Sequence, residues 1–121
     1  MTDFVMRGPR DEGLLSRLLE AIPGLADAPE YLALDTSDKR LPYIVAARAS
    51  EYWERLEREQ ESQLLNALSA GLESLAGDLD PAVRDLVVAI LNPLGADSPL
   101  AKRMKLHLGP NAKALLEKFV R

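Results

Sequence analysis

Five glutamates crowd one short stretch of this chain, and paired carboxylates are the most obvious candidates for chemistry. They are Glu51, Glu54, Glu57, Glu59 and Glu61. Carboxylates on facing helices can hold two iron ions, but such sites also need Glu-x-x-His partners. The chain has a single histidine, so it cannot supply both of those partners. Because Arg55 and Arg58 are interleaved with the glutamates, we expect a solvated, ion-paired face and no bound metal.

The other residue types that carry chemistry are equally sparse. There is no cysteine, which excludes disulfides, thiolate metal sites and a cysteine nucleophile. No Gly-rich phosphate loop, nucleophile elbow or kinase signature is present. His107 stands just before Gly109, where a positive ring suits a helix C-terminus, and metal sites need two or more such ligands. We therefore expect a protein that is not an enzyme and takes no cofactor.

Tyr52 and Trp53 adjoin the glutamates and are the strongest candidates for binding another molecule. Neighbouring residues on a helix point about 100° apart, so the two rings cannot face the same core. In one arrangement a ring lies exposed, as Tyr and Trp do when they anchor interfaces. In the other, both rings are partly buried in a broad groove. The predicted partner-binding site comprises Tyr52, Trp53, Glu57, Glu59 and Glu61.

Charge is spread unevenly along the chain. The net charge is −4, but residues 101–121 contain six cations and one anion, a local charge of +5 that leaves −9 on the first hundred residues. Such asymmetry can steer a partner, although cations near helix C-termini give a simpler explanation. The N-terminus lacks the apolar region of a secretion signal, and no apolar run spans a membrane. We expect a cytoplasmic protein that does not contact a membrane.

Helices are the elements predicted to carry all of these residues. The clearest one begins at Asp80-Pro81, where Asp80 can cap the first turn and proline costs nothing. It ends at Asn92, because the residue before a proline is pushed out of the helical region. Its apolar residues recur at the spacing of one helix face, and they are Val83, Leu86, Val87, Ile90 and Leu91. Another helix, from about Asp11 to Ile22, ends at Pro23-Gly24.

Nothing interrupts the helical pattern from Tyr43 to about Gly77, yet an unbroken helix of about 35 residues is too long for a compact domain of this size. We place a turn within residues 57–62, where apolar residues are missing. Nothing alternates polar and apolar residues as a strand does. The sequence predicts a flexible arm over residues 1–10 and one all-α domain over 11–121, with six or seven helices packed as antiparallel hairpins. Its predicted core contains Leu18, Leu19, Leu68, Leu72, Val83, Leu86, Val87, Ile90, Leu115 and Leu116.

Two resemblances follow from these patterns. The hairpin formed by residues 64–75 and the helix after Asp78-Leu79-Asp80 resembles one HEAT-type helical hairpin, through its Asp-x-Asp turn and Val83-Arg84 start. Over residues 14–119 the order of elements is similar to an uncharacterised family of small bacterial all-helical proteins. The matching motifs are Leu14-Leu15, Leu18-Leu19, Pro23, Leu25, Leu41-Pro42-Tyr43 and Leu108-Gly109-Pro110. The resemblance implies an all-helical fold and brings no activity with it.

The leading functional hypothesis is a non-catalytic protein-binding module, with an acidic face that meets a basic surface on another protein. Some small helical proteins of this kind are immunity partners of bacterial toxins, so an immunity or regulatory role toward a toxin or effector is the analogy we carry forward. The alternative is a self-associating, homo-oligomeric helical protein or a nucleic-acid accessory that uses the basic C-terminal segment. Nucleic acid is the less favoured partner, because the pI is about 5.0 and the basic residues lack interleaved aromatics.

Overall fold

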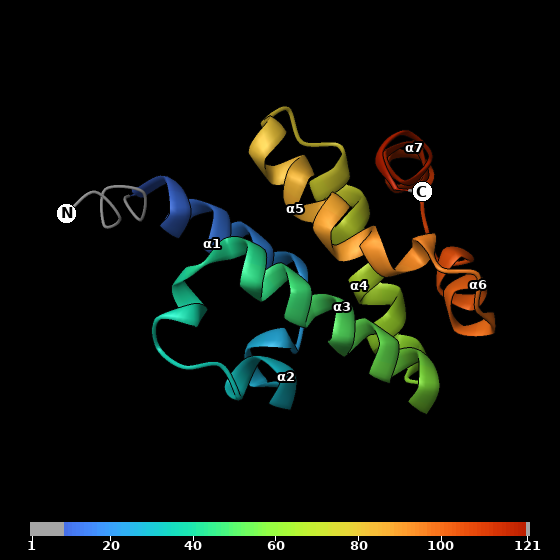
Figure 1. Ribbon diagram of the computed structural model, residues 1–121, viewed down its shortest axis with the longest axis horizontal. Coiled ribbons are helices and arrows are strands. Elements are labelled where there is room, and N and C mark those ends of the chain that lie inside the picture. The colour runs from blue at the N-terminus through green and yellow to red at the C-terminus, as the bar shows by residue number, and fades with distance from the viewer. Residues whose placement is uncertain (1–8, 121) are drawn as a thin grey trace.

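The computed structural model describes residues 9–120 of the chain (Figure 1). Within that range the structure contains seven α-helices, three short 3-10 turns and no strand, which confirms the all-α prediction. The helices are α1 (Pro9–Ala21), α2 (Pro29–Leu32), α3 (Pro42–Glu59), α4 (Ser62–Ala76), α5 (Pro81–Leu91), α6 (Pro99–Lys105) and α7 (Pro110–Phe119). The predicted arm over residues 1–10 lies outside the described residues except for its last two, which already belong to α1.

Proline opens six of these helices, as expected for a residue that has no N–H to lose at the first helical position. Side-chain caps complete two of the starts. Asp80 accepts a hydrogen bond from the backbone N–H of Ala82 at 2.9 Å, and Ser98 accepts one from Ala101 at 3.1 Å. The carboxylate of Glu73 in α4 caps α7 from outside, because it accepts hydrogen bonds from the N–H groups of Asn111 and Ala112.

The turn predicted within residues 57–62 is confirmed. Helix α3 ends at Glu59, and Gln60 takes a left-handed conformation with φ of 58°. The N–H of Gln60 bonds to the carbonyl of Glu57, and the N–H of Glu61 bonds to that of Leu56. This pair of bonds is the Schellman arrangement that usually employs glycine, and here glutamine occupies the left-handed position. The absence of glycine explains why the sequence does not mark the exact boundary.

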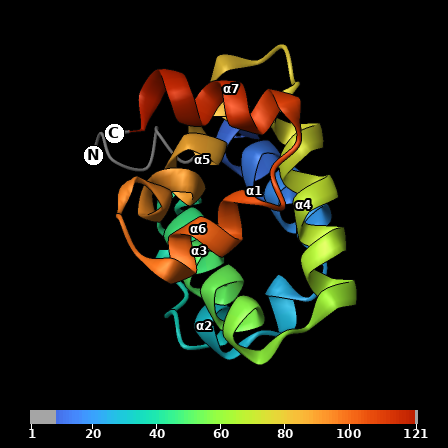
Figure 2. The same ribbon diagram turned by 90° about the vertical axis from the view of Figure 1, so that its right-hand side faces the viewer.

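Helix α3 lies at the centre of the fold, with α1, α2, α4, α5 and α6 packed around it (Figures 1 and 2). Helices α4 and α5 form an antiparallel pair that α7 covers, and α2 and α7 lie at opposite ends of the molecule in both views. Ser50 ties α3 to α5, because its hydroxyl donates a 2.7 Å hydrogen bond to the carbonyl oxygen of Ile90. No helix in residues 9–120 is both long and apolar enough to cross a membrane.

The core follows the predicted apolar stripes. All five stripe residues of α5 are buried, as are Leu18, Leu68 and Leu72. Leu19, Leu115 and Leu116 are only partly buried and pack against the edge of the core. Helices α1 and α4 approach so closely that a Cβ atom on Gly71 would lie 1.7 Å from the carbonyl oxygen of Ala21, which is why this position holds a glycine.

Candidate functional site

The aromatic pair is buried, so the prediction of an exposed anchor ring is wrong. The exposed fraction is 3% for Tyr52 and 0% for Trp53. The alternative of two partly buried rings in a groove also understates the burial. The physical reason is the central position of α3, since helices on several of its sides cover rings that point about 100° apart. Trp53 is a core residue and cannot contact a partner.

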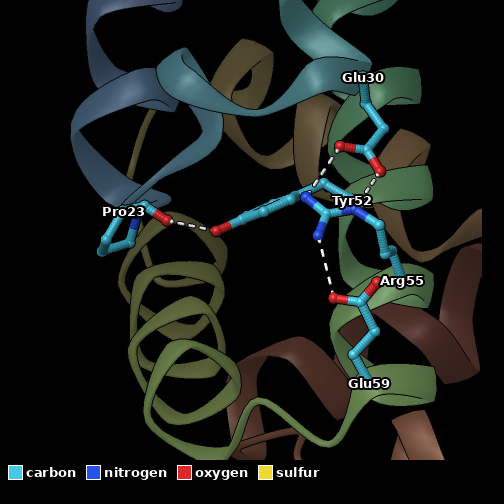
Figure 3. Close-up of polar contacts among 5 residues, drawn as sticks. All are labelled: Pro23, Glu30, Tyr52, Arg55 and Glu59. Carbon is cyan, nitrogen blue, oxygen red and sulfur yellow. Dashed lines mark hydrogen bonds and ion pairs between the residues drawn. The ribbon is translucent and has the colours of Figure 1, made fainter.

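Tyr52 and Arg55 hold the segment before α3 against that helix (Figure 3). The Tyr52 hydroxyl donates a 3.0 Å hydrogen bond to the carbonyl oxygen of Pro23. The Arg55 guanidinium binds both carboxylate oxygens of Glu30, from Nε at 2.7 Å and from Nη2 at 3.2 Å. Its Nη1 atom reaches Glu59 at 3.2 Å, and the guanidinium lies 5.5 Å from the centre of the Tyr52 ring. This two-pronged geometry is the strong form of an arginine–carboxylate pair.

The charges in this cluster perturb one another. The hydrogen bond from Arg55 holds the pKa of the Glu30 carboxyl below its ordinary value, and the same bond raises the pKa of Arg55. Burial raises the pKa of the Tyr52 hydroxyl. Both members of the Arg55–Glu30 pair are therefore held in their charged forms, and Tyr52 is held in its neutral form, in which it can donate to Pro23.

Glu57 is not a rim residue, which corrects a second site prediction. Its side chain is 9% exposed and faces α6 and the turn that follows it, where Arg103 Nε lies 3.5 Å from one carboxylate oxygen and His107 Nε2 lies 3.0 Å from the other. A carboxylate that is largely removed from water needs such partners. Glu57 thus bridges α3 to the segment around α6, and His107 has a structural partner fifty residues away.

The remaining predicted residues meet at a hollow beside the α3–α4 turn. Glu59 and Glu61 are exposed, and together with Tyr52 they line a depression of about 300 Å³. We call this depression the acidic hollow. Its opposite wall comes from residues 24–29, including Asp27, which the sequence analysis did not single out. Three of the five predicted residues therefore share one site, and Trp53 and Glu57 lie elsewhere.

Carboxylates dominate the charge of the acidic hollow. Arg55 is the single cation in its lining, whereas Asp27, Glu59 and Glu61 line it and Glu30 binds Arg55 from beside it. Arg55 already binds two of these carboxylates, Glu30 and Glu59, so its positive charge is neutralised within the protein. In the described part of the chain, no cation is paired with Asp27 or Glu61. The hollow carries an uncompensated negative charge.

The arrangement differs from a metal site and from a large ligand pocket. Within the described residues, no group of three or more His, Cys, Asp or Glu side chains is placed to hold a metal ion. A volume of about 300 Å³ is at the lower limit of small-molecule pockets, and it is large enough to admit one long side chain. The geometry defines an all-α domain with an open, negatively charged hollow at one end.

Comparison with known proteins adds no family to this description. No protein-family model matches the chain, and no curated protein and no solved structure matches it either. The resemblances to a HEAT-type hairpin and to small bacterial all-helical proteins therefore remain predictions.

Proposed function

We propose that this chain is a non-catalytic protein-binding module, and that the acidic hollow receives a lysine or arginine side chain of its partner. One observation carries the proposal. A hollow large enough for one long side chain is bordered by Asp27, Glu59 and Glu61, while Arg55, the one cation that the described residues place in its lining, is already bound to carboxylates of the same chain. A cationic side chain placed there would gain charge-assisted hydrogen bonds that the free protein lacks.

The walls of the acidic hollow support this proposal because they are fixed before binding. One wall is the helix α3, and the other is tied to it by the Tyr52–Pro23 hydrogen bond and the Arg55–Glu30 pair. A site that is already ordered loses little conformational freedom on binding, so more of the interaction energy appears as affinity. The apolar side chain of Leu64, which is partly exposed in the lining, can contact the methylene stem of a lysine or arginine.

A protein partner agrees better with this charge than nucleic acid does. Phosphates would be repelled by the carboxylates of the hollow. The predicted basic C-terminal segment is partly neutralised, since Lys102 pairs with Asp97 and Arg103 pairs with Glu57. Electrostatic attraction between an acidic module and a basic surface mainly raises the association rate and the specificity of a complex.

The biological role we propose is that of an immunity or regulatory partner of a bacterial toxin or effector. The analogy with small helical immunity proteins supports this role. It concerns the nature of the partner and not the position of the binding site. Toxins that act on nucleic acid expose basic surfaces, which are the surfaces that an acidic hollow would recognise.

Site-specific photo-cross-linking tests the proposal. A photoreactive residue replaces Gln63, which is exposed and adjoins the acidic hollow, or Ala96, which is exposed before α6 and serves as the control. Each protein is exposed to a lysate of the source organism, and the cross-linked chains are identified by mass spectrometry. We expect one protein to be captured from position 63 and not from position 96, at a lysine- or arginine-containing segment. Equal capture from both positions, or none from position 63, would refute the proposal.

A further inference from the structure

A second surface feature lies at the other end of the molecule from α2, between α5 and α7 (Figures 1 and 2). Here a groove of about 330 Å³ is lined by the apolar side chains of Val88, Leu115 and Phe119. Phe119 is 54% exposed, although phenylalanine side chains are usually buried. The groove and the exposed ring lie next to each other on one face.

The rim of this groove carries charges of both signs. Arg84 and Lys118 contribute two positive charges, and Asp85 contributes one negative charge. With two cations and one anion, the rim has a net charge of +1, whereas the chain as a whole carries −4. The rim thus contrasts with the acidic hollow, where carboxylates outnumber cations.

We infer that this face binds a second copy of the chain, through a two-fold interface in which Phe119 of each copy enters the groove of the other. A two-fold interface uses the same patch on both molecules, so the patch must contain a projection beside a hollow and a cation beside an anion. The α5–α7 face meets both conditions. Two acidic molecules repel each other, and a face without excess negative charge lets them approach with less repulsion than the rest of the surface.

Charge complementarity also fixes the register of the interface. If each Phe119 ring lies in the groove of the other copy, Lys118 next to it comes to the rim where Asp85 of that copy stands. Lys118 now lies 5.2 Å from the centre of its own Phe119 ring, and no ion pair is formed by Asp85 within the described residues. The interface would thus contain two equivalent Asp85–Lys118 pairs around a pair of buried phenylalanines.

Sedimentation equilibrium over about a hundredfold range of protein concentration tests this inference. We expect the wild-type chain to show a concentration-dependent monomer–dimer equilibrium. Phe119→Asp should raise the dimer dissociation constant by about a hundredfold or more, because each dimer loses two anchor rings. The matched control is Leu32→Asp, which alters a residue of the same exposure, 55%, on the distant helix α2 and should leave the dimer intact.

Charge exchange keeps the test decisive if Phe119→Asp disturbs the fold. Asp85→Lys and Lys118→Glu should each weaken the dimer, and the double variant should restore it, because the exchanged charges again meet across the interface. Circular dichroism checks that each variant keeps its helices. The inference is overturned if the wild-type chain stays monomeric at all concentrations. It is also overturned if Phe119→Asp folds normally and its dimer dissociation constant equals that of the wild type. A different protein bound at this groove of a monomeric chain would overturn it as well.

Discussion

Gly71 gives a sharp prediction, because its structural environment and its helix propensity predict opposite effects of an added methyl group. In an exposed helix interior, replacing glycine by alanine is worth about 0.5–1 kcal/mol of added stability. At Gly71 the new Cβ atom would lie 1.7 Å from the carbonyl oxygen of Ala21, and real Cβ contacts essentially never fall below 3.0 Å. Helices α1 and α4 would have to separate by the difference, about 1.3 Å.

The size of that separation determines how much stability the Gly71→Ala variant loses. The obstacle is backbone rather than a flexible side chain, so it cannot rotate away. A gap of about 0.5–1 Å already forfeits a quarter to a half of a van der Waals contact, so the buried leucines of both helices would lose packing. Overpacking of this kind costs about 1–3 kcal/mol and occasionally more. We place Gly71→Ala at or above the upper end of that range, which leaves a net loss of about 2 kcal/mol or more after the propensity gain.

Urea denaturation measures this loss, and the chain supplies its own probe. Trp53 is the only tryptophan and is fully buried, so its fluorescence reports unfolding of the core. Gly13→Ala is the matched control, because Gly13 lies in α1 with no atom within 4 Å of the added Cβ. It should stabilise the protein by about 0.5–1 kcal/mol. The reasoning is refuted if Gly71→Ala proves as stable as the wild type or changes stability in the same direction as Gly13→Ala.

Three further predictions use the same denaturation assay. Leu86→Ala should cost about 2–5 kcal/mol because the fully buried side chain leaves a cavity, and a loss below about half a kcal/mol would contradict its core position. Trp53→Ala should cost about 3–5 kcal/mol, here followed by circular dichroism; a fold left unchanged would contradict the burial of Trp53. Glu30→Gln tests how the stability of the fold depends on the ionisation of Glu30. Because Arg55 lowers the folded-state pKa of Glu30, its contribution to stability is present above the ordinary carboxyl pKa and is lost as the pH falls through the lowered value. The wild type should therefore exceed the variant in stability at neutral pH and match it in strong acid, and a difference independent of pH would argue against the pair.

Local signals explain why α5 could be predicted from the sequence in detail. Asp80 caps the helix, Pro81 opens it and Asn92 before a proline ends it, and each of these effects acts within a few residues. The turn between α3 and α4 could be placed by the local shortage of apolar residues. Its exact position could not, because the left-handed residue there is Gln60 instead of the glycine that usually marks such an end.

The candidate site depended on contacts that the sequence does not show. Whether Tyr52 and Trp53 are buried is decided by how many helices surround α3, and no residue of α3 encodes that number. Glu57 belongs to a bridge because His107, fifty residues later, lies 3.0 Å away. Asp27 lines the same hollow as Glu61 because Tyr52 and Arg55 hold the segment around it against α3. The charge and the exposure of Glu59 and Glu61 could be predicted from the sequence, whereas the residues that lie near them in space could not.

Association kinetics of the cross-linked partner, at low and at high salt, test binding through the acidic hollow most directly. The variant combines Glu59→Lys with Glu61→Lys, and the control combines Glu12→Lys with Asp97→Lys, which makes the same change in net charge at exposed positions outside the hollow. We predict that the hollow variant lowers the association rate by on the order of tenfold or more at low salt, and that the loss shrinks at high salt. The control should lose far less. Equal losses in the two variants would contradict binding at the acidic hollow, because net charge alone would then explain the effect.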